Sequence, residues 1–295
     1  MATRVPNRMA RLNNMRRSGG LATKGARVTL PAGHTEGFSM KDVHASASTG
    51  FTRQSGNYEQ GRPDYPIALQ GWLRDTLGVG NGTTVLDLGA GTGKFTRLLT
   101  PLAPRLTAVE PVAAMRERFH EQLPEVPVLE GTAQHMPVAD ASQQVLVCAQ
   151  AFHWFADAAA LAEMHRVLAP GGRLGLVWNV RDESVDWVAR ITEIITPYEG
   201  DTPRFHTGRW REAFDGRWFS APTLTTLPHV HEGSPQTVII ERLRSVSFIA
   251  ALPQVEQDKV MARLQDLIDH HPDLKGRERI AFPYQTQAYR CQRLD

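Results

Sequence analysis

The sequence is poor in cysteine, lacks a long apolar run and carries almost no net charge. Its 295 residues include only two cysteines, Cys148 and Cys291, and Cys148 continues the apolar run 145–147. A disulfide framework is therefore not expected, and a reducing compartment is favoured. No apolar run approaches the roughly 20 residues that a membrane-spanning helix needs, so we expect a soluble protein with no membrane partner. The formal net charge of +2 indicates no preference for acidic or basic partners.

Acidic residues are absent from the first 35 positions. Seven lysines and arginines lie between Arg4 and Arg27, ahead of the first acidic residue, Glu36. This composition predicts a disordered basic arm over residues 1–50. A mitochondrial targeting segment, a nucleic-acid-binding tail and an upstream extension without function all fit such an arm. The arm lacks an amphipathic apolar face, which favours the extension, so we expect a cytoplasmic location with a mitochondrial one as the alternative.

The rest of the chain alternates short apolar runs with amphipathic segments. This alternation predicts a parallel sheet with helices on both faces, in one domain over residues 51–295. A cofactor-binding core is expected over 58–180, and a substrate-side and sheet-closing part over 181–295. The expected strands are 84–88, 106–109, 128–130, 145–149, 174–178, 223–231 and 284–294. The expected helices include 67–77, 157–168, 185–195 and 254–270, and the segment 235–252 is expected to contain a further one.

Residues 198–219 break this alternation, because glycine, proline and charge are mixed with five aromatic residues between Phe205 and Phe219. One interpretation is a lid or substrate wall. The other is a satellite hydrophobic cluster beneath a long loop. The pattern alone does not separate them.

The stretch Val85–Leu99 predicts a ligand site. An apolar run ends in three alternate glycines, Gly89, Gly91 and Gly93, and an amphipathic pattern follows. This is the pattern of a buried strand, a tight turn and a helix start. Glycines suit a turn whose backbone must come close to a ligand, so a bound small molecule is expected here.

Glycine spacing separates the kinds of nucleotide site. A phosphate-binding P-loop requires G-x-x-x-x-G-K-[ST], but Leu88 stands at its first glycine and Phe95 at its Ser or Thr. The dinucleotide fingerprint G-x-G-x-x-G requires glycine at position 94, where this chain has Lys94. The sequence thus departs from the P-loop pattern at two positions and from the dinucleotide pattern at one.

The remaining pattern, DLGAGTG at 87–93, resembles that of class I S-adenosylmethionine-dependent methyltransferases. Further segments resemble the family in the same order: TAVEP at 107–111, GTA at 131–133, QAFHW at 150–154 and LAPGGRL at 168–174. The segments YEQGRPDYP at 58–66 and PYQTQAYRCQRL at 283–294 look like the branch of trans-aconitate and cantharidin methyltransferases. The resemblance implies a Rossmann-like sheet of seven strands, mostly parallel, with the last strand antiparallel.

The resemblance also implies the residues that bind S-adenosylmethionine. An acid such as Asp87 suits the ammonium of its aminoacyl end, and Glu110, about twenty residues after the glycines, suits its ribose hydroxyls. Arg62 is expected to meet its carboxylate. The full expected set is Tyr58, Arg62, Asp87, Gly89, Ala90, Gly91, Gly93, Glu110, Met115, Thr132, Ala133, Gln150 and Ala151.

His153, Trp154 and Arg181 are expected to face the substrate. His153 is the candidate catalytic residue, as a general base, although such a histidine can also orient the substrate or pack against Trp154. Arg181 could receive an acidic group. His229 and His231 alternate on one expected strand like metal ligands, but no Cys or carboxylate cluster accompanies them, so no metal is expected.

We therefore expect an enzyme that transfers a methyl group to a small molecule, first of all to a carboxylate oxygen of an acidic metabolite. Carbon methylation of a quinone-like or sterol-like lipid and a non-catalytic cofactor-binding module are the alternatives. No nucleic-acid partner is expected, because the folded part has no basic stripe. A monomer or homodimer is expected.

Overall fold

The computed structural model describes residues 61–295, which all belong to one compact unit, Met40–Asp295. The expected basic arm and Tyr58 lie outside the described residues. Among residues 61–295, no helix combines the length and the apolar character that crossing a membrane requires.

The described residues form a seven-stranded sheet in the order β3-β2-β1-β4-β5-β7-β6. Neighbouring strands from β3 to β5 are parallel, and β7 runs antiparallel to both β5 and β6. This confirms the fold class, with the last strand antiparallel. The strands are β1 (Thr84–Leu88), β2 (Arg105–Val109), β3 (Val128–Leu129), β4 (Gln143–Ala149), β5 (Leu168–Arg181), β6 (Thr223–Gly233) and β7 (Ile280–Gln292).

Alternate side chains of the central strands enter two separate hydrophobic cores, because successive residues of a strand point to opposite faces. Val85 and Val145 face the core formed with α3 (Leu69–Asp75), α4 (Thr96–Leu99) and α5 (Ala113–Gln122). Leu86 and Leu146 face the core formed with α6 (Ala158–Val167). The sheet is thus covered on both faces, which explains its nearly continuous apolar strands.

The fifth strand is longer than the sequence pattern predicts. The segment Pro170–Gly172 is expected to be a turn before a strand at 174, but β5 already begins at Leu168 and runs to Arg181. Its pairing with β4 shifts between Gln143/Leu168 and Val145/Arg173, so the prolyl-glycyl segment forms an irregularity within the strand. The far end is extended because β7 pairs with β5 up to Arg181.

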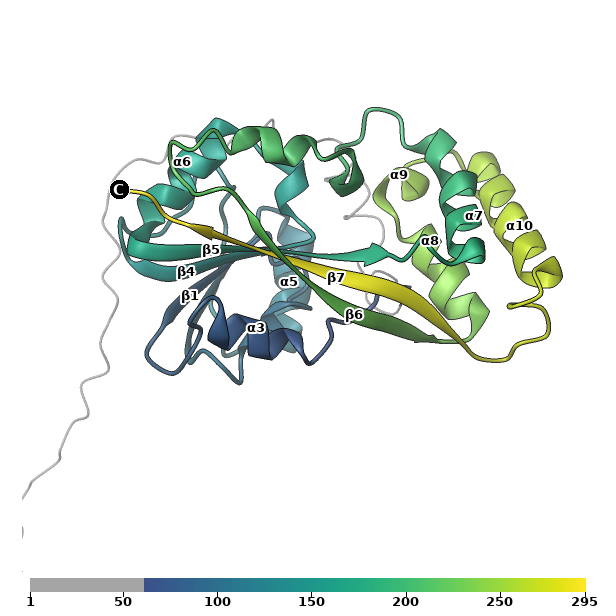
Figure 1. Ribbon diagram of the computed structural model, residues 1–295, viewed down its shortest axis with the longest axis horizontal. Helices are drawn as coiled ribbons and strands as arrows, with labels where there is room; N and C mark the ends of the chain where they lie inside the picture. Colours follow the sequence, from purple (N-terminus) through teal and green to yellow (C-terminus); the bar gives the residue numbers. More distant parts are fainter. Residues whose placement is uncertain (1–60) are drawn as a thin grey trace, which may run out of the picture. The chain divides into compact units, whose positions relative to one another are not determined.

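A helical layer packs around a third core beyond the sheet's parallel part. It contains α7 (Asp186–Ile195), α10 (Gln254–His270) and three short helices, where the sequence pattern predicts one helix within 235–252. These are a π-helix (η6, Gln236–Glu241), α8 (Arg242–Arg244) and α9 (Ser247–Ala250). Figure 1 shows α7 to α10 gathered beside one end of β6 and β7.

The aromatic stretch 205–219 packs mainly as a hydrophobic cluster. Trp210 and Phe219 are buried in the core that contains α6, and Trp210 lies 4.9 Å from Trp178, measured between ring centroids. Two short 3₁₀ turns, Phe205–Thr207 and Arg209–Ala213, carry Phe205 and Trp210, whereas Phe219 forms an isolated bridge with Arg293. The cluster interpretation therefore accounts for most of the stretch.

Candidate functional site

The glycine turn follows β1 and is hydrogen-bonded to the end of β2. The amide of Gly89 donates to the carbonyl of Val109 at 2.8 Å. Gly89, Gly91 and Gly93 have φ values of +71°, +57° and +87°, a region that side-chain-bearing residues rarely adopt. The alternate glycines are therefore required by the backbone conformation of the turn.

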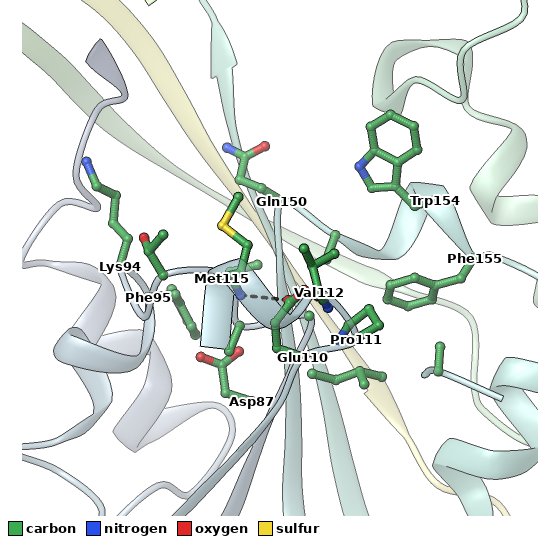
Figure 2. A pocket seen from close by; sticks show the side chains of 18 of the residues that line it. Asp87, Lys94, Phe95, Glu110, Pro111, Val112, Met115, Gln150, Trp154 and Phe155 are labelled. Atoms are coloured by element: carbon green, nitrogen blue, oxygen red, sulfur yellow. Dashed lines mark hydrogen bonds between the residues drawn. The ribbon is translucent and has the colours of Figure 1, made fainter. Parts of the chain in front are cut away.

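A cavity of about 160 Å³ opens beside this turn, at the carboxyl ends of β1, β2 and β4. Figure 2 shows Asp87 and Glu110 on one side of it, with Gln150 and Trp154 on the other. It brings together eleven of the thirteen residues expected to bind the cofactor: Arg62, Asp87, Gly89, Ala90, Gly91, Glu110, Met115, Thr132, Ala133, Gln150 and Ala151.

Gly93 does not line this cavity. A Cβ at Gly93 would lie 2.8 Å from Cδ1 of Leu123 and 3.0 Å from Cδ2 of Phe119. Its place in the motif is therefore explained by its positive φ and by close packing against α5, a role that spacing alone does not distinguish from ligand contact.

Asp87 fits the ammonium group of an aminoacyl cofactor. Its side chain is fully buried and its Oδ2 accepts a 2.6 Å hydrogen bond from the hydroxyl of Thr96. Its Oδ1 is buried with no hydrogen-bond partner in the described structure. Burial raises the pKa of Asp87 to about 7, and the negative charge of Glu110 adds to this. A bound cation would supply the missing partner and stabilise the ionised carboxylate.

Glu110 supports the turn as well as facing the cavity. Its Oε2 accepts from the amide of Gly91 and its Oε1 from the amide of Val112, both at 2.9 Å. Burial raises the pKa of Glu110, while these two bonds and the charge of Arg116 oppose the rise. Each carboxylate oxygen has a second lone pair, so the side chain can also accept from a diol in the cavity.

A strap over residues 61–65 lies across the cavity. The side-chain amide Nδ2 of Asn179 donates to the backbone carbonyl of Asp64 at 2.9 Å. Nζ of Lys94 donates to the backbone carbonyl of Arg62 at 2.6 Å and lies 3.2 Å from Oδ1 of Asp64. Nη2 of Arg62 in turn donates to the carbonyl of Ser245 at 3.1 Å. The strap thus joins the glycine turn to the helical layer.

Several lining residues were not expected from the sequence, among them Tyr65, Lys94, Phe95, Asn179 and Arg242. Lys94 and Phe95 directly follow the glycines, so their proximity to the motif is a signal that could have found them. Arg242 lies in the helical layer, far from every motif, and no local pattern identifies it.

A second cavity, of about 130 Å³, adjoins the first. Both cavities are lined by Arg62, Gln150, Trp154, Asn179 and Arg242, which form their shared wall. The three residues expected to face the substrate, His153, Trp154 and Arg181, all line the second cavity. The aromatic stretch contributes Phe205 and His206 to it, so that part of the stretch does form a wall.

His153 is held as a neutral side chain. Its Nδ1 accepts a 3.1 Å hydrogen bond from the indole Nε1 of Trp178. Burial lowers the pKa of His153 to about 3, and the positive charges of Arg204 and Arg62 contribute. At neutral pH the ring therefore has little tendency to take up a proton.

The second cavity is rich in arginine. Arg62, Arg181, Arg204 and Arg242 line it, together with the single carboxylate Glu183. Burial lowers the pKa of Arg204 to about 10, and the charges of Arg181, Arg242 and Arg62 lower it further against the opposing effect of Glu199, whose Oε1 lies 3.2 Å from Arg204 Nε. Positive charge thus exceeds negative charge around this cavity.

In the described part of the chain, no three His, Cys, Asp or Glu side chains gather as a metal site. His229 and His231 do alternate on β6, on the same face as Tyr284 and Phe282 of β7, which lie opposite them.

Comparison with known proteins agrees with the fold. Residues 86–176 match the model of a methyltransferase domain. An uncharacterised methyltransferase-like protein of Schizosaccharomyces pombe is 35% identical over 244 residues, which are 81% of this chain and 93% of that protein. An uncharacterised methyltransferase of Mycobacterium bovis is 37% identical over 248 residues, 83% of this chain and 96% of the relative.

The fold also matches solved structures. One of them, from Anaeromyxobacter dehalogenans and assigned as a type II methyltransferase, superposes with a TM-score of 0.58 at 22% identity, covering 79% of this chain and 96% of that chain.

The fold and the first cavity define an α/β enzyme that binds a cofactor at the carboxyl ends of its parallel strands. The similarity over most of its length shows that the chain belongs to the methyltransferase family. The expected class, a methyltransferase dependent on S-adenosylmethionine, is thereby confirmed.

Proposed function

We propose that the protein transfers a methyl group from S-adenosylmethionine to a carboxylate oxygen of a small acidic molecule. The observation that carries this proposal is the arginine-rich second cavity, which shares a wall with the cofactor cavity. Guanidinium groups bind carboxylates through paired, charge-assisted hydrogen bonds. A neutral or cationic acceptor would leave the excess of positive charge around this cavity uncompensated.

Arg242 is the arginine best suited to hold the reacting carboxylate. It lines both cavities, and its Nε and Nη1 atoms are buried with no hydrogen-bond partner among the described residues. Buried donors are normally paired, so a bound carboxylate at the shared wall would satisfy them.

The state of His153 supports the same acceptor. A carboxylic acid in solution is ionised at neutral pH, since its usual pKa is about 4. It can attack without losing a proton, so no general base is required. A histidine with a pKa of about 3 is a poor general base, but it can line the acceptor cavity as an uncharged side chain.

The bound cofactor supplies an activated methyl group on its sulfonium sulfur. The protein's own residues then bind the acceptor, orient it and exclude water. We propose that Arg242, Asn179 and Gln150 at the shared wall position the acceptor. Trp154 and Phe205 then form the apolar walls that exclude water.

Fractionation of a metabolite extract tests this proposal. We would separate the extract by anion exchange and incubate each fraction with the protein and S-adenosylmethionine labelled in its methyl group. Label should enter compounds from the retained, acidic fractions. If only compounds from the unretained fraction gain label, the proposal is wrong.

The variant Arg242→Gln should lower the transfer at least tenfold while S-adenosylmethionine still binds. Arg244→Gln is the matched control, because this arginine lies on the same helix and is exposed. It should transfer label at the normal rate. Normal transfer by the Arg242→Gln variant would show that Arg242 does not hold the reacting carboxylate.

A further inference from the structure

A row of polar side chains crosses three strands, and two of its three members line the second cavity. Arg181 of β5 lies directly opposite Tyr284 of β7, and Tyr284 lies opposite His229 of β6. Residues that face each other across antiparallel strands project from the same side of the sheet, with Cβ atoms about 5 Å apart. Arg181 and Tyr284 line the second cavity but not the first.

The hydroxyl of Tyr284 has an unusual environment. The residue is only 3% exposed, and its Oη is buried with no hydrogen-bond partner in the described part of the chain. Its ring is held by Phe282 at 4.8 Å and faces His229 at 6.2 Å, measured between ring centroids. A tyrosine needed only for packing would lose nothing as phenylalanine, whereas a buried hydroxyl without a partner destabilises the fold.

The surroundings favour an oxygen-bearing ligand for this hydroxyl. The neighbouring Arg181 is a half-buried donor whose pKa is lowered by burial and by Arg242, while Tyr284, Glu183 and Glu199 oppose the change. His229 and His231, on the same side of the sheet, also have buried Nε2 atoms without partners among the described residues. Polar atoms without partners among the described residues thus lie on one side of β6 and β7, and the hydroxyl-bearing Tyr284 among them lines the second cavity.

We propose that Tyr284 is a specificity-determining residue, whose hydroxyl donates to a second oxygen-bearing group at the end of the acceptor away from the cofactor cavity. This inference rests on the proposed function, because it assumes that the shared wall holds the reacting carboxylate. Arg181 is the charged neighbour of the same subsite. The acceptor is then a small molecule with oxygen groups at both ends.

A pair of matched probes tests the subsite without knowledge of the natural acceptor. Glutarate carries a carboxylate at each end of its chain, and butyrate carries one at only one end. Binding of each is measured by calorimetry to the full-length protein saturated with S-adenosylhomocysteine, the demethylated form of the cofactor. We expect the wild-type protein to bind glutarate at least tenfold more tightly than butyrate.

The variant Tyr284→Phe removes only the hydroxyl and keeps the ring contacts. It should reduce the preference for glutarate at least fivefold, leave the affinity for butyrate unchanged and keep the melting temperature within error or higher. Tyr198→Phe is the control, because that tyrosine packs in the helical layer and lines neither cavity. It should retain the full preference.

The outcomes separate this inference from the function on which it rests. Butyrate and glutarate that bind equally well, or a preference that persists in Tyr284→Phe, would overturn the subsite and leave carboxylate methylation standing. If neither probe binds the wild-type protein, carboxylate recognition itself fails, and the subsite fails with it.

Discussion

The two adjoining cavities are built in different ways. The first is lined largely by consecutive residues at the ends of β1, β2 and β4, around one glycine turn. The second is assembled from short segments far apart in the chain, 153–154, 178–181 and 204–206 among them, together with single residues such as Arg62 and Arg242. The first cavity is therefore largely a local property of the sequence, whereas the second is a product of the complete fold.

The two cavities also differ in charge. Two buried carboxylates, Asp87 and Glu110, face the first cavity beside Arg62, Lys94 and Arg242, whereas the second is lined by four arginines and one carboxylate, Glu183, with Arg62 and Arg242 common to both. A buried charge requires a compensating partner. The proposed function uses this difference, because it places a positively charged cofactor group beside Asp87 and a negatively charged acceptor beyond the shared wall.

The largest expected effect comes from filling the glycine turn, which should damage the first cavity alone. A Cβ at Gly91 would meet no atom within 4 Å, so Gly91→Val places a branched side chain in the cavity and adds strain at a φ of +57°. We expect at least a hundredfold loss of S-adenosylmethionine affinity by calorimetry, with an unchanged circular dichroism spectrum.

Gly276→Val controls for the strain in this experiment, because Gly276 has a φ of +69°, lines neither cavity and is equally open. It should bind the cofactor normally. A Gly91→Val variant that also binds normally would show that the turn is not the cofactor site.

A smaller effect is expected from pH, again at the first cavity. The pKa of Asp87 is raised to about 7, so the carboxylate is protonated below that pH and ionised above it. The cofactor's ammonium, with a usual pKa near 8, stays charged throughout this range. Affinity for S-adenosylmethionine should therefore fall about tenfold from pH 7 to pH 5.5, as proton linkage at a single group requires.

The variant Asp87→Asn isolates this group from Glu110. It should bind the cofactor weakly with little change over the same pH range. It should also melt at a higher temperature than the wild type at pH 8, because an ionised Asp87 destabilises the fold when its pKa is raised by burial. Parallel pH profiles for the two proteins would rule out Asp87 as the titrating group.

The smallest effect on methyl transfer is expected from replacing His153, which lines the second cavity. In His153→Asn the amide oxygen can still accept from Trp178. Transfer to the acidic metabolite fraction should fall by about threefold or less, with no change in the shape of its pH profile. A loss of a hundredfold or more, concentrated at low pH, would instead assign His153 the role of general base.

The contrast between the cavities explains what the sequence could predict. Strand periodicity located β1 from Thr84 to Leu88 without error, and the glycine spacing located the first cavity, because both depend on neighbouring residues. Gly93 lies outside the cavity because its contacts are with α5, a distant segment. The fifth strand was predicted too short, because its length depends on pairing with β7.

The lining of the second cavity was predicted only in part for the same physical reason. His153 and Trp154 follow β4 directly, and Arg181 ends β5, so strand ends located them. Arg242 lies at the shared wall and directly follows the π-helix η6. Tyr284 lines the second cavity because β7 pairs it with Arg181 of β5. Arg242 has no signal in the local sequence. Tyr284 lies in the expected strand 284–294, but only the tertiary pairing shows that it lines the cavity.

Alkaline hydrolysis of the labelled product tests the central claim most directly. After incubation with methyl-labelled S-adenosylmethionine and the acidic metabolites, the purified product is heated in dilute alkali and the volatile label is measured. A methyl ester on a carboxylate should release its label as methanol. A product whose label survives this treatment carries its methyl on carbon, on nitrogen or in an ether, and would contradict the account.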